Sequence, residues 1–208
     1  MPLREHARFC SGRCRVAWNR EKVGDPAIKV NALQWSISAM SDTTERLASV
    51  NAGDWPRAFV LIGEAVWWVT IVDATLVRYH LVGAYDAVMA DQTPAERRLI
   101  EDTLTGLRFV RNRIGDEVDL DEFIEPGPPG SGAGTGRVTG WTWKSEPEPA
   151  LASVPPRTRS WEMTRYRAYQ AQLAGHTIGE IFGRAVAVLE LTAANAPSIT
   201  DISAHAAS

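Results

Sequence analysis

The pattern of hydrophobic positions along the chain predicts a mainly α-helical protein. Its most apolar stretch, residues 58–80, has apolar side chains at spacings of three and four and on its other sides as well. Asp54 and Pro56 stand just before this stretch, where a capping side chain and a residue without a backbone N–H favour a helix start. We therefore expect a central helix that ends near His80 and has neighbouring helices all round it.

The segments on either side of this stretch also carry helix signals. Thr93 with Glu96, and Thr177 with Glu180, have the spacing of a capping box, in which two residues satisfy each other's free backbone N–H groups. Residues 81–90 either prolong the central helix or form a short helix of their own. In total we predict a bundle of four or five helices. Apart from the central helix, the predicted helices cover residues 29–51, 94–115, 160–175 and 177–191.

Composition divides the chain into a helical bundle domain, residues 29–195, and three less regular segments. Residues 1–25 form a short basic appendage, and residues 196–208 a small polar tail that we expect to be frayed. Residues 126–140 are rich in Pro and Gly, so we predict a flexible loop excursion that contributes nothing to the core. The tryptophans just after this loop should attach it to the bundle.

Two acidic residues, Glu64 and Asp73, interrupt the apolar central helix. Each acid costs about 2.5–3.5 kcal/mol near the centre of a bilayer, which roughly cancels the gain from the aliphatic side chains, so we predict that the helix does not span a membrane. Their spacing places the two acids on opposite faces of the helix. Each either forms a structural ion pair, with Arg108 or Arg111 as the candidate partner, or belongs to a functional site.

The net charge of −3 over 208 residues is unevenly distributed. Residues 1–22 hold six Arg or Lys against two Glu, so the N-terminus is a basic arm on an acidic protein. Arg greatly outnumbers Lys, and together with the Ala, Gly and Pro content this bias indicates a GC-rich bacterial genome. The first twenty residues lack the apolar segment of a signal peptide, so we expect a cytoplasmic protein.

The arm contains the two cysteines of the chain, Cys10 and Cys14. The sequence FCSGRCR around them resembles the second half of FCS-type zinc ribbons, and this resemblance implies two zinc-binding thiolates at the start of a helix. The upstream C-x-x-C half is missing, and structural zinc needs four ligands. The segment is then a metal-free knuckle, or further ligands lie upstream of Met1, or His6 and another group complete the site. We expect no cofactor unless upstream ligands exist.

A knuckle of this kind would present a basic and aromatic surface of Arg13, Arg15, Trp18 and Arg20. Such a surface is suited to nucleic acid, because arginines contact phosphates and an indole ring stacks on bases. The alternative is a solvated basic tail with no ligand. Six basic residues are a small electrostatic footprint, so the sequence leaves both interpretations open.

No complete catalytic signature is present: the chain has no serine-nucleophile elbow, no cysteine with an identifiable histidine partner and no di-metal motif. Residues 107–115, LRFVRNRIG, resemble the R-N-x-x-x-H element of HEPN-type helical domains, many of which are ribonucleases. The resemblance implies that Arg111 would hold a phosphate, with Asn112 beside it. The position of the histidine holds Asp116, so the motif is incomplete.

The chain as a whole resembles an uncharacterised family of bacterial proteins, a resemblance that implies no function. Our leading hypothesis is a non-enzymatic binding or regulatory protein whose partner is a protein or, through the basic arm, a nucleic acid. A homodimer is compatible with this hypothesis. The alternative is a HEPN-like ribonuclease built on Arg111 and Asn112, with Glu64 or Asp73 as a supporting acid.

Overall fold

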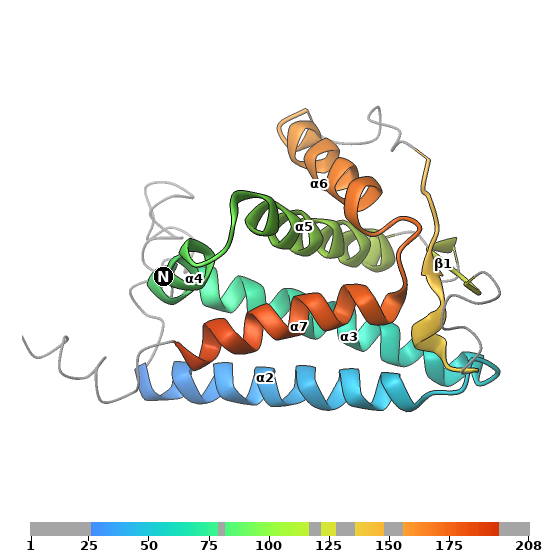
Figure 1. Cartoon of the computed structure of the whole chain (residues 1–208), viewed down its shortest axis with the longest axis horizontal. Helices are drawn as coiled ribbons and strands as arrows, with labels where there is room; N and C mark the ends of the chain where they lie inside the picture. The colour runs from blue at the N-terminus through green and yellow to red at the C-terminus, as the bar shows by residue number, and fades with distance from the viewer. Residues whose placement is uncertain (1–25, 79–81, 117–121, 128–135, 148–155, 196–208) are drawn as a thin grey trace, which may run out of the picture. The chain divides into compact units, whose positions relative to one another are not determined.

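The computed structural model describes residues 26–78, 82–116, 122–127, 136–147 and 156–195. These residues confirm the predicted mainly α-helical fold (Figure 1). The chain separates into two compact units, one of residues 33–197 and a smaller one of residues 1–32 and 198–208. Of the smaller unit, only the first part of one helix is described. The predicted appendage, residues 1–25, and the predicted tail, residues 196–208, lie outside the described residues.

The described residues form six α-helices, against the four or five predicted, because residues 82–90 form a helix of their own. Figure 1 shows α2, α7, α5 and α6 one above another, with α3 behind α7. A hydrogen bond from Ser41 to Glu190 joins α2 to α7. The helices are α2 (Pro26–Ser49), α3 (Trp55–Arg78), α4 (Val82–Ala90), α5 (Pro94–Asp116), α6 (Arg159–Gln172) and α7 (Ile178–Ala194).

The predicted helix starts are confirmed where a capping side chain defines them. Thr93 and Glu96 form the complete capping box of α5, because the Thr93 backbone N–H donates to Glu96 Oε2 at 2.9 Å and the Glu96 N–H donates to Thr93 Oγ1 at 3.3 Å. Thr177 caps α7 in the same way, through the Glu180 N–H at 3.2 Å. The Glu180 carboxylate, however, binds Arg184 at 3.0 Å, so only half of the second predicted box is formed.

Helix α3 supplies the centre of the core, but one of its sides is exposed. Its inner side is fully buried against α4, α5 and α7. On the outer side, Val60, Trp67 and Val77 are each about half exposed, although the Arg111 side chain of α5 lies over the Trp67 ring. The prediction of neighbours all round is therefore wrong for this side, because the helices that pack on α3 leave it open. The buried residues of α3 are Ala58, Leu61, Ile62, Ala65, Val66, Val69, Thr70, Val72, Asp73 and Leu76.

Within the described residues, α3 is also the one helix long and apolar enough to cross a membrane, over Trp55–Val77. Half of its most apolar window is buried inside the bundle. The central helix of a soluble protein has the same length and composition, so this finding is weak evidence for a membrane span. That α3 does not span a membrane stays a prediction.

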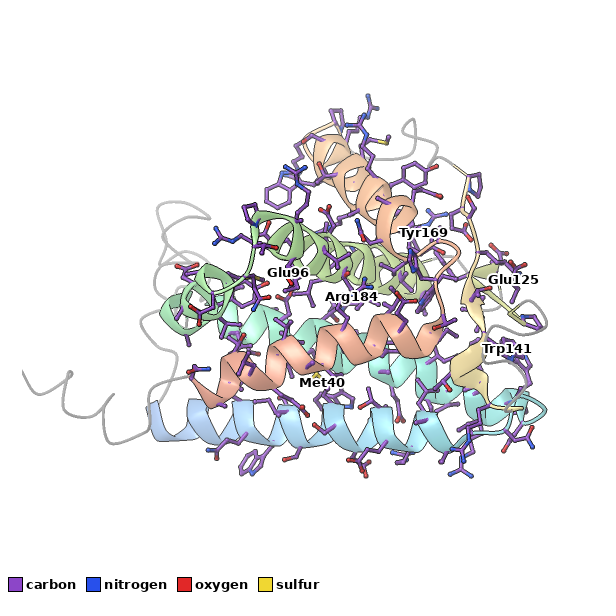
Figure 2. The ribbon with its side chains drawn as sticks, viewed as in Figure 1. Met40, Glu96, Glu125, Trp141, Tyr169 and Arg184 are labelled. Atoms are coloured by element: carbon purple, nitrogen blue, oxygen red, sulfur yellow. The ribbon has the colours of Figure 1, made fainter. Side chains whose placement is uncertain are left out.

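The segment before α6 is attached to the bundle by a two-stranded antiparallel sheet, β1 (Ile124–Glu125) and β2 (Thr142–Trp143), and by the 3-10 helix η4 (Val138–Gly140). Trp143 is fully buried, and Trp141 stacks on Trp55 at the start of α3 with ring centroids 4.7 Å apart. These contacts confirm that the tryptophans attach this excursion to the bundle. Figure 2 shows Trp141 at this end of the bundle.

The prediction of a flexible loop over residues 126–140 is wrong for the C-terminal end of this range. Val138 is fully buried in the core, and its backbone N–H donates to Val50 O at 3.1 Å. The preceding Arg137 donates from Nη1 to Ala48 O at 2.6 Å, at the end of α2. Composition missed this attachment because a single apolar residue in a polar segment gives no periodic signal. Residues 128–135 lie outside the described residues.

Helices α5 and α6 pack closely against each other, and Gly106 permits this contact. A Cβ atom added at Gly106 would lie 3.1 Å from the Tyr169 Cα and 2.6 Å from the Leu173 Cδ1. Around this contact, the Tyr169 ring packs against Phe109 and Phe123, with centroids 5.4 and 5.7 Å away. The Tyr169 hydroxyl donates to Lys144 O at 2.5 Å, so this residue joins α6 to α5 and to the segment after β2 (Figure 2).

We expect Gly106→Ala to lower the free energy of unfolding by about 1–3 kcal/mol, because the new methyl group meets the Tyr169 backbone. The matched control is Gly183→Ala in α7, where an added Cβ has no atom within 4 Å. At that exposed helical position alanine should raise the free energy of unfolding by about 0.5–1 kcal/mol. Urea denaturation of both variants measures the contrast, and equal stabilities would contradict the close contact.

Candidate functional site

The buried acid of α3 is paired with an arginine of α5. Arg108 donates from Nε to Asp73 Oδ2 at 2.8 Å, and its Nη2 group donates to the same oxygen. The Asp73 side chain is 1% exposed, whereas that of Arg108 is 37% exposed. The structure therefore confirms the ion-pair interpretation for Asp73 and selects Arg108, not Arg111, as its partner.

The pair is asymmetric, and this asymmetry governs its electrostatics. Both donors reach Asp73 Oδ2, so Oδ1 is buried with no hydrogen-bond partner among the described residues. Burial raises the pKa of Asp73, and the Arg108 charge offsets this effect only in part. Burial and the nearby Asp73 charge also raise the pKa of Tyr85 in α4, so its phenol stays neutral at physiological pH.

The solvent side of Arg108 lines a surface pocket of about 350 Å³ between α5 and α6. We call it the α5–α6 pocket. Its lining combines two guanidinium groups with hydroxyl groups and one large aromatic ring. Arg108 therefore extends from the buried acid to solvent. The lining residues are Thr105 and Arg108 from α5, and Ser160, Trp161, Thr164 and Arg165 from α6.

This lining favours an anionic group. Within the described part of the chain, Arg165 has no acidic partner, and the Nη1 group of Arg108 makes no bond to Asp73. Two cations on neighbouring helices thus face one pocket, while the one acid in contact with them lies behind Arg108. Guanidinium groups bind carboxylate or phosphate oxygens through paired N–H donors, which makes this pocket a candidate anion site.

Sequence reasoning missed this pocket, since Arg108 was considered only as a partner for the acids of the central helix. Arg165, Ser160 and Trp161 carry no motif, and they reach Arg108 only through the packing of α6 on α5. The only sequence signal for this pocket was that two predicted helices carry arginines on partly polar faces. Such a pattern is common on solvated helices, so it could not have identified the site.

Arg111, the predicted phosphate-binding residue of the HEPN-like alternative, lies over the Trp67 ring, with its guanidinium carbon 4.5 Å from the centroid. Its Nε is buried and has no hydrogen-bond partner among the described residues. Asn112 is half-buried next to it. In the part of the chain that the structure describes, neither residue forms a hydrogen bond or ion pair with Glu64 or Asp73. Among the described residues, Arg111 is therefore engaged with Trp67 and pairs with neither of the acids that the alternative would use.

Glu64 lies in a different setting from Asp73, as its position on the opposite face of α3 predicts. It faces Arg46 of α2 at 3.8 Å, and both side chains are more than 40% exposed. An exposed pair at this distance contributes little to stability. Arg46 also contacts Asp42 on its own helix at 3.3 Å. Glu64 is thus part of a solvated charge cluster and shares no contact with the α5–α6 pocket.

The metal and nucleic-acid predictions fall outside the described residues. Asp116 is the last residue of α5, and its side chain is not described. No group of three or more metal-ligating side chains occurs among the residues that are described. His176, in this described part, pairs with Glu180 at 3.3 Å. The residues of these predictions that lie outside are Cys10, Cys14, Arg13, Arg15, Trp18 and Arg20.

Burial of Asp73 predicts a pH dependence of stability. Because its folded-state pKa is raised above the ordinary 3.8, the folded protein binds more protons than the unfolded chain just above that pH. The free energy of unfolding should therefore fall as pH rises through this window. Asp73→Asn removes the titrating group, so its stability should lack this fall. Urea denaturation of both proteins from about pH 4 to about pH 7 tests the sign. If the free energy of unfolding of the wild type rose with pH relative to that of Asp73→Asn, the predicted sign would be contradicted.

Comparison with known proteins found no relative of this chain. No protein-family model, no curated protein and no solved structure matches this chain. The likenesses to FCS-type zinc ribbons and to HEPN-type domains therefore rest on the residues quoted for them and stay predictions.

Proposed function

We propose that this protein is a non-enzymatic binding protein whose α5–α6 pocket holds a small anionic ligand. One observation carries the proposal: Arg108, fixed from behind by the buried Asp73, lies in the same pocket as Arg165. Two guanidinium groups at one concave site are the chemistry that binds phosphate or carboxylate. The net charge of this group is positive, because it contains two cations and one acid.

Asp73 acts in this proposal as a positioning residue. An arginine free in solution loses rotamer freedom when it binds a ligand, and this loss weakens binding. Here Nε and Nη2 of Arg108 are already committed to Asp73, so the orientation of the guanidinium is set before a ligand arrives. The proposal thus gives a reason for an acid in the most apolar helix of the chain.

The described lining of the pocket supports binding without catalysis. It contains hydroxyl groups and guanidinium groups, but no histidine, carboxylate or thiol that could accept a proton or attack a substrate at neutral pH. Asp73 is turned away from solvent and is occupied by Arg108. A bound anion would therefore be held and not converted.

We expect pyrophosphate to bind wild-type protein and to bind Arg165→Gln at least about tenfold more weakly, because a charge-assisted hydrogen bond is lost. Arg167→Gln is the matched control, since Arg167 is exposed on the same helix and does not line the pocket. Isothermal titration calorimetry at low and physiological salt measures both. Equal losses in the two variants would mean nonspecific attraction and would overturn the proposal.

The other functional hypotheses stay predictions. Nucleic-acid binding through Arg13, Arg15 and Arg20 concerns residues outside the described range, and a salt-dependent titration with DNA and RNA tests it. For the ribonuclease alternative, we expect purified protein to leave single-stranded RNA intact, because Arg111 is stacked on Trp67 and Asp73 is occupied by Arg108. Cleavage that disappears in Arg111→Ala would contradict this expectation.

A further inference from the structure

We infer that the anionic ligand of the α5–α6 pocket is a mononucleotide, a phosphate joined to a flat aromatic ring. The inference rests on the proposed function, since it names the ligand class of the same site. Its basis is the placement of Trp161 beside Arg108 and Arg165 in one pocket. A base would stack on the indole ring while the two guanidinium groups bind the phosphate.

Trp161 presents a large apolar ring to solvent. The side chain is 68% exposed although it lies at the edge of a pocket, so most of its ring faces water. Large apolar rings gain free energy when they are covered, and indole rings stack well on every nucleic-acid base. The ring therefore offers a platform next to two phosphate-binding groups, which a pocket for a simple inorganic anion would not require.

The Thr164 hydroxyl gives the pocket a hydrogen-bond acceptor. Thr164 donates its hydroxyl hydrogen to Ser160 O at 2.9 Å, so its oxygen is left to accept hydrogen bonds. A ribose hydroxyl or a base amino group can donate to this oxygen, whereas a phosphate cannot. The guanidinium groups therefore match a phosphate, and the Thr164 oxygen matches a donor of the sugar or base.

The size of the pocket limits the ligand. A volume of about 350 Å³ is at the small end of ordinary ligand sites, which range over about 300–1,000 Å³. One nucleotide fits such a volume, whereas the second half of a dinucleotide would extend beyond it. A nucleic-acid strand would need further stacking rings along its path, and among the described lining residues Trp161 is the only aromatic one.

The test compares adenosine 5′-monophosphate, uridine 5′-monophosphate, ribose 5-phosphate and adenosine by calorimetry on the full chain. We expect the two mononucleotides to bind about tenfold or more tightly than ribose 5-phosphate, because one base–indole stack is worth about that factor. Trp161→Ala should remove this advantage and leave ribose 5-phosphate affinity unchanged. Trp35→Ala is the matched control, since Trp35 is 69% exposed on α2, away from the pocket lining.

The outcomes separate this inference from the proposed function. If ribose 5-phosphate binds as tightly as the mononucleotides and loses affinity in Arg165→Gln, the anion site stands and the mononucleotide is excluded. If Trp35→Ala weakens nucleotide binding as much as Trp161→Ala, stacking at this pocket is excluded. Adenosine that binds as tightly as its monophosphate would exclude the phosphate contacts. If no phosphate compound binds at millimolar concentration, both proposals fail.

Discussion

The ion pair between Asp73 and Arg108 is the interaction on which the arrangement of the site depends. A carboxylate in the centre of an apolar helix needs a cation, and losing that partner costs about 3–5 kcal/mol when the charge stays buried. Arg108 supplies the cation from α5, and so connects the core helix to the surface. The contact is incomplete, because Asp73 Oδ1 receives no donor among the described residues, which explains why burial still dominates its pKa.

A second constraint, the close approach of α6 to α5, places the remaining groups. Gly106 brings the two helices together, and the rings of Phe109, Phe123 and Tyr169 fill the space beside it. Arg184 of α7, labelled in Figure 2, donates to Thr103 on another part of α5, so α7 is attached to α5 as well. The pocket is thus held by packing on one side of α5 and by an ion pair on another.

Local signals in the sequence were sufficient for the helices, because capping and apolar spacing act within a few residues. Thr93 with Glu96 marked the start of α5 for this reason. The sequence could not show which arginine pairs with the buried acid of α3, since Arg108 and Arg111 lie within one turn of each other. Only the rotation of α5 against α3 places Arg108 on Asp73 and Arg111 on Trp67.

Of the candidate site, only the buried acid stood out in the sequence. Asp73 stood out because a charge on an apolar helix requires an explanation from its own surroundings. The α5–α6 pocket did not, because its residues come from two helices whose contact depends on Gly106 and Tyr169. The exposed side of α3 was also unpredictable, since apolar spacing gives the hydrophobicity of each face but not which faces other helices will cover.

Helix α6 carries the pocket residues and the core residues one after another along the same side, at spacings of four, and this has a consequence for how its length can change in evolution. Trp161 and Arg165 line the pocket, and Tyr169 and Leu173, one and two turns further along, pack against α5 and the core. Deleting or inserting one residue between Arg165 and Tyr169 would turn one set by about 100° relative to the other. Substitutions at single positions can be compensated, but a one-residue gap inside α6 would separate ligand contact from packing. Changes in length should therefore be confined to the segments outside the helix.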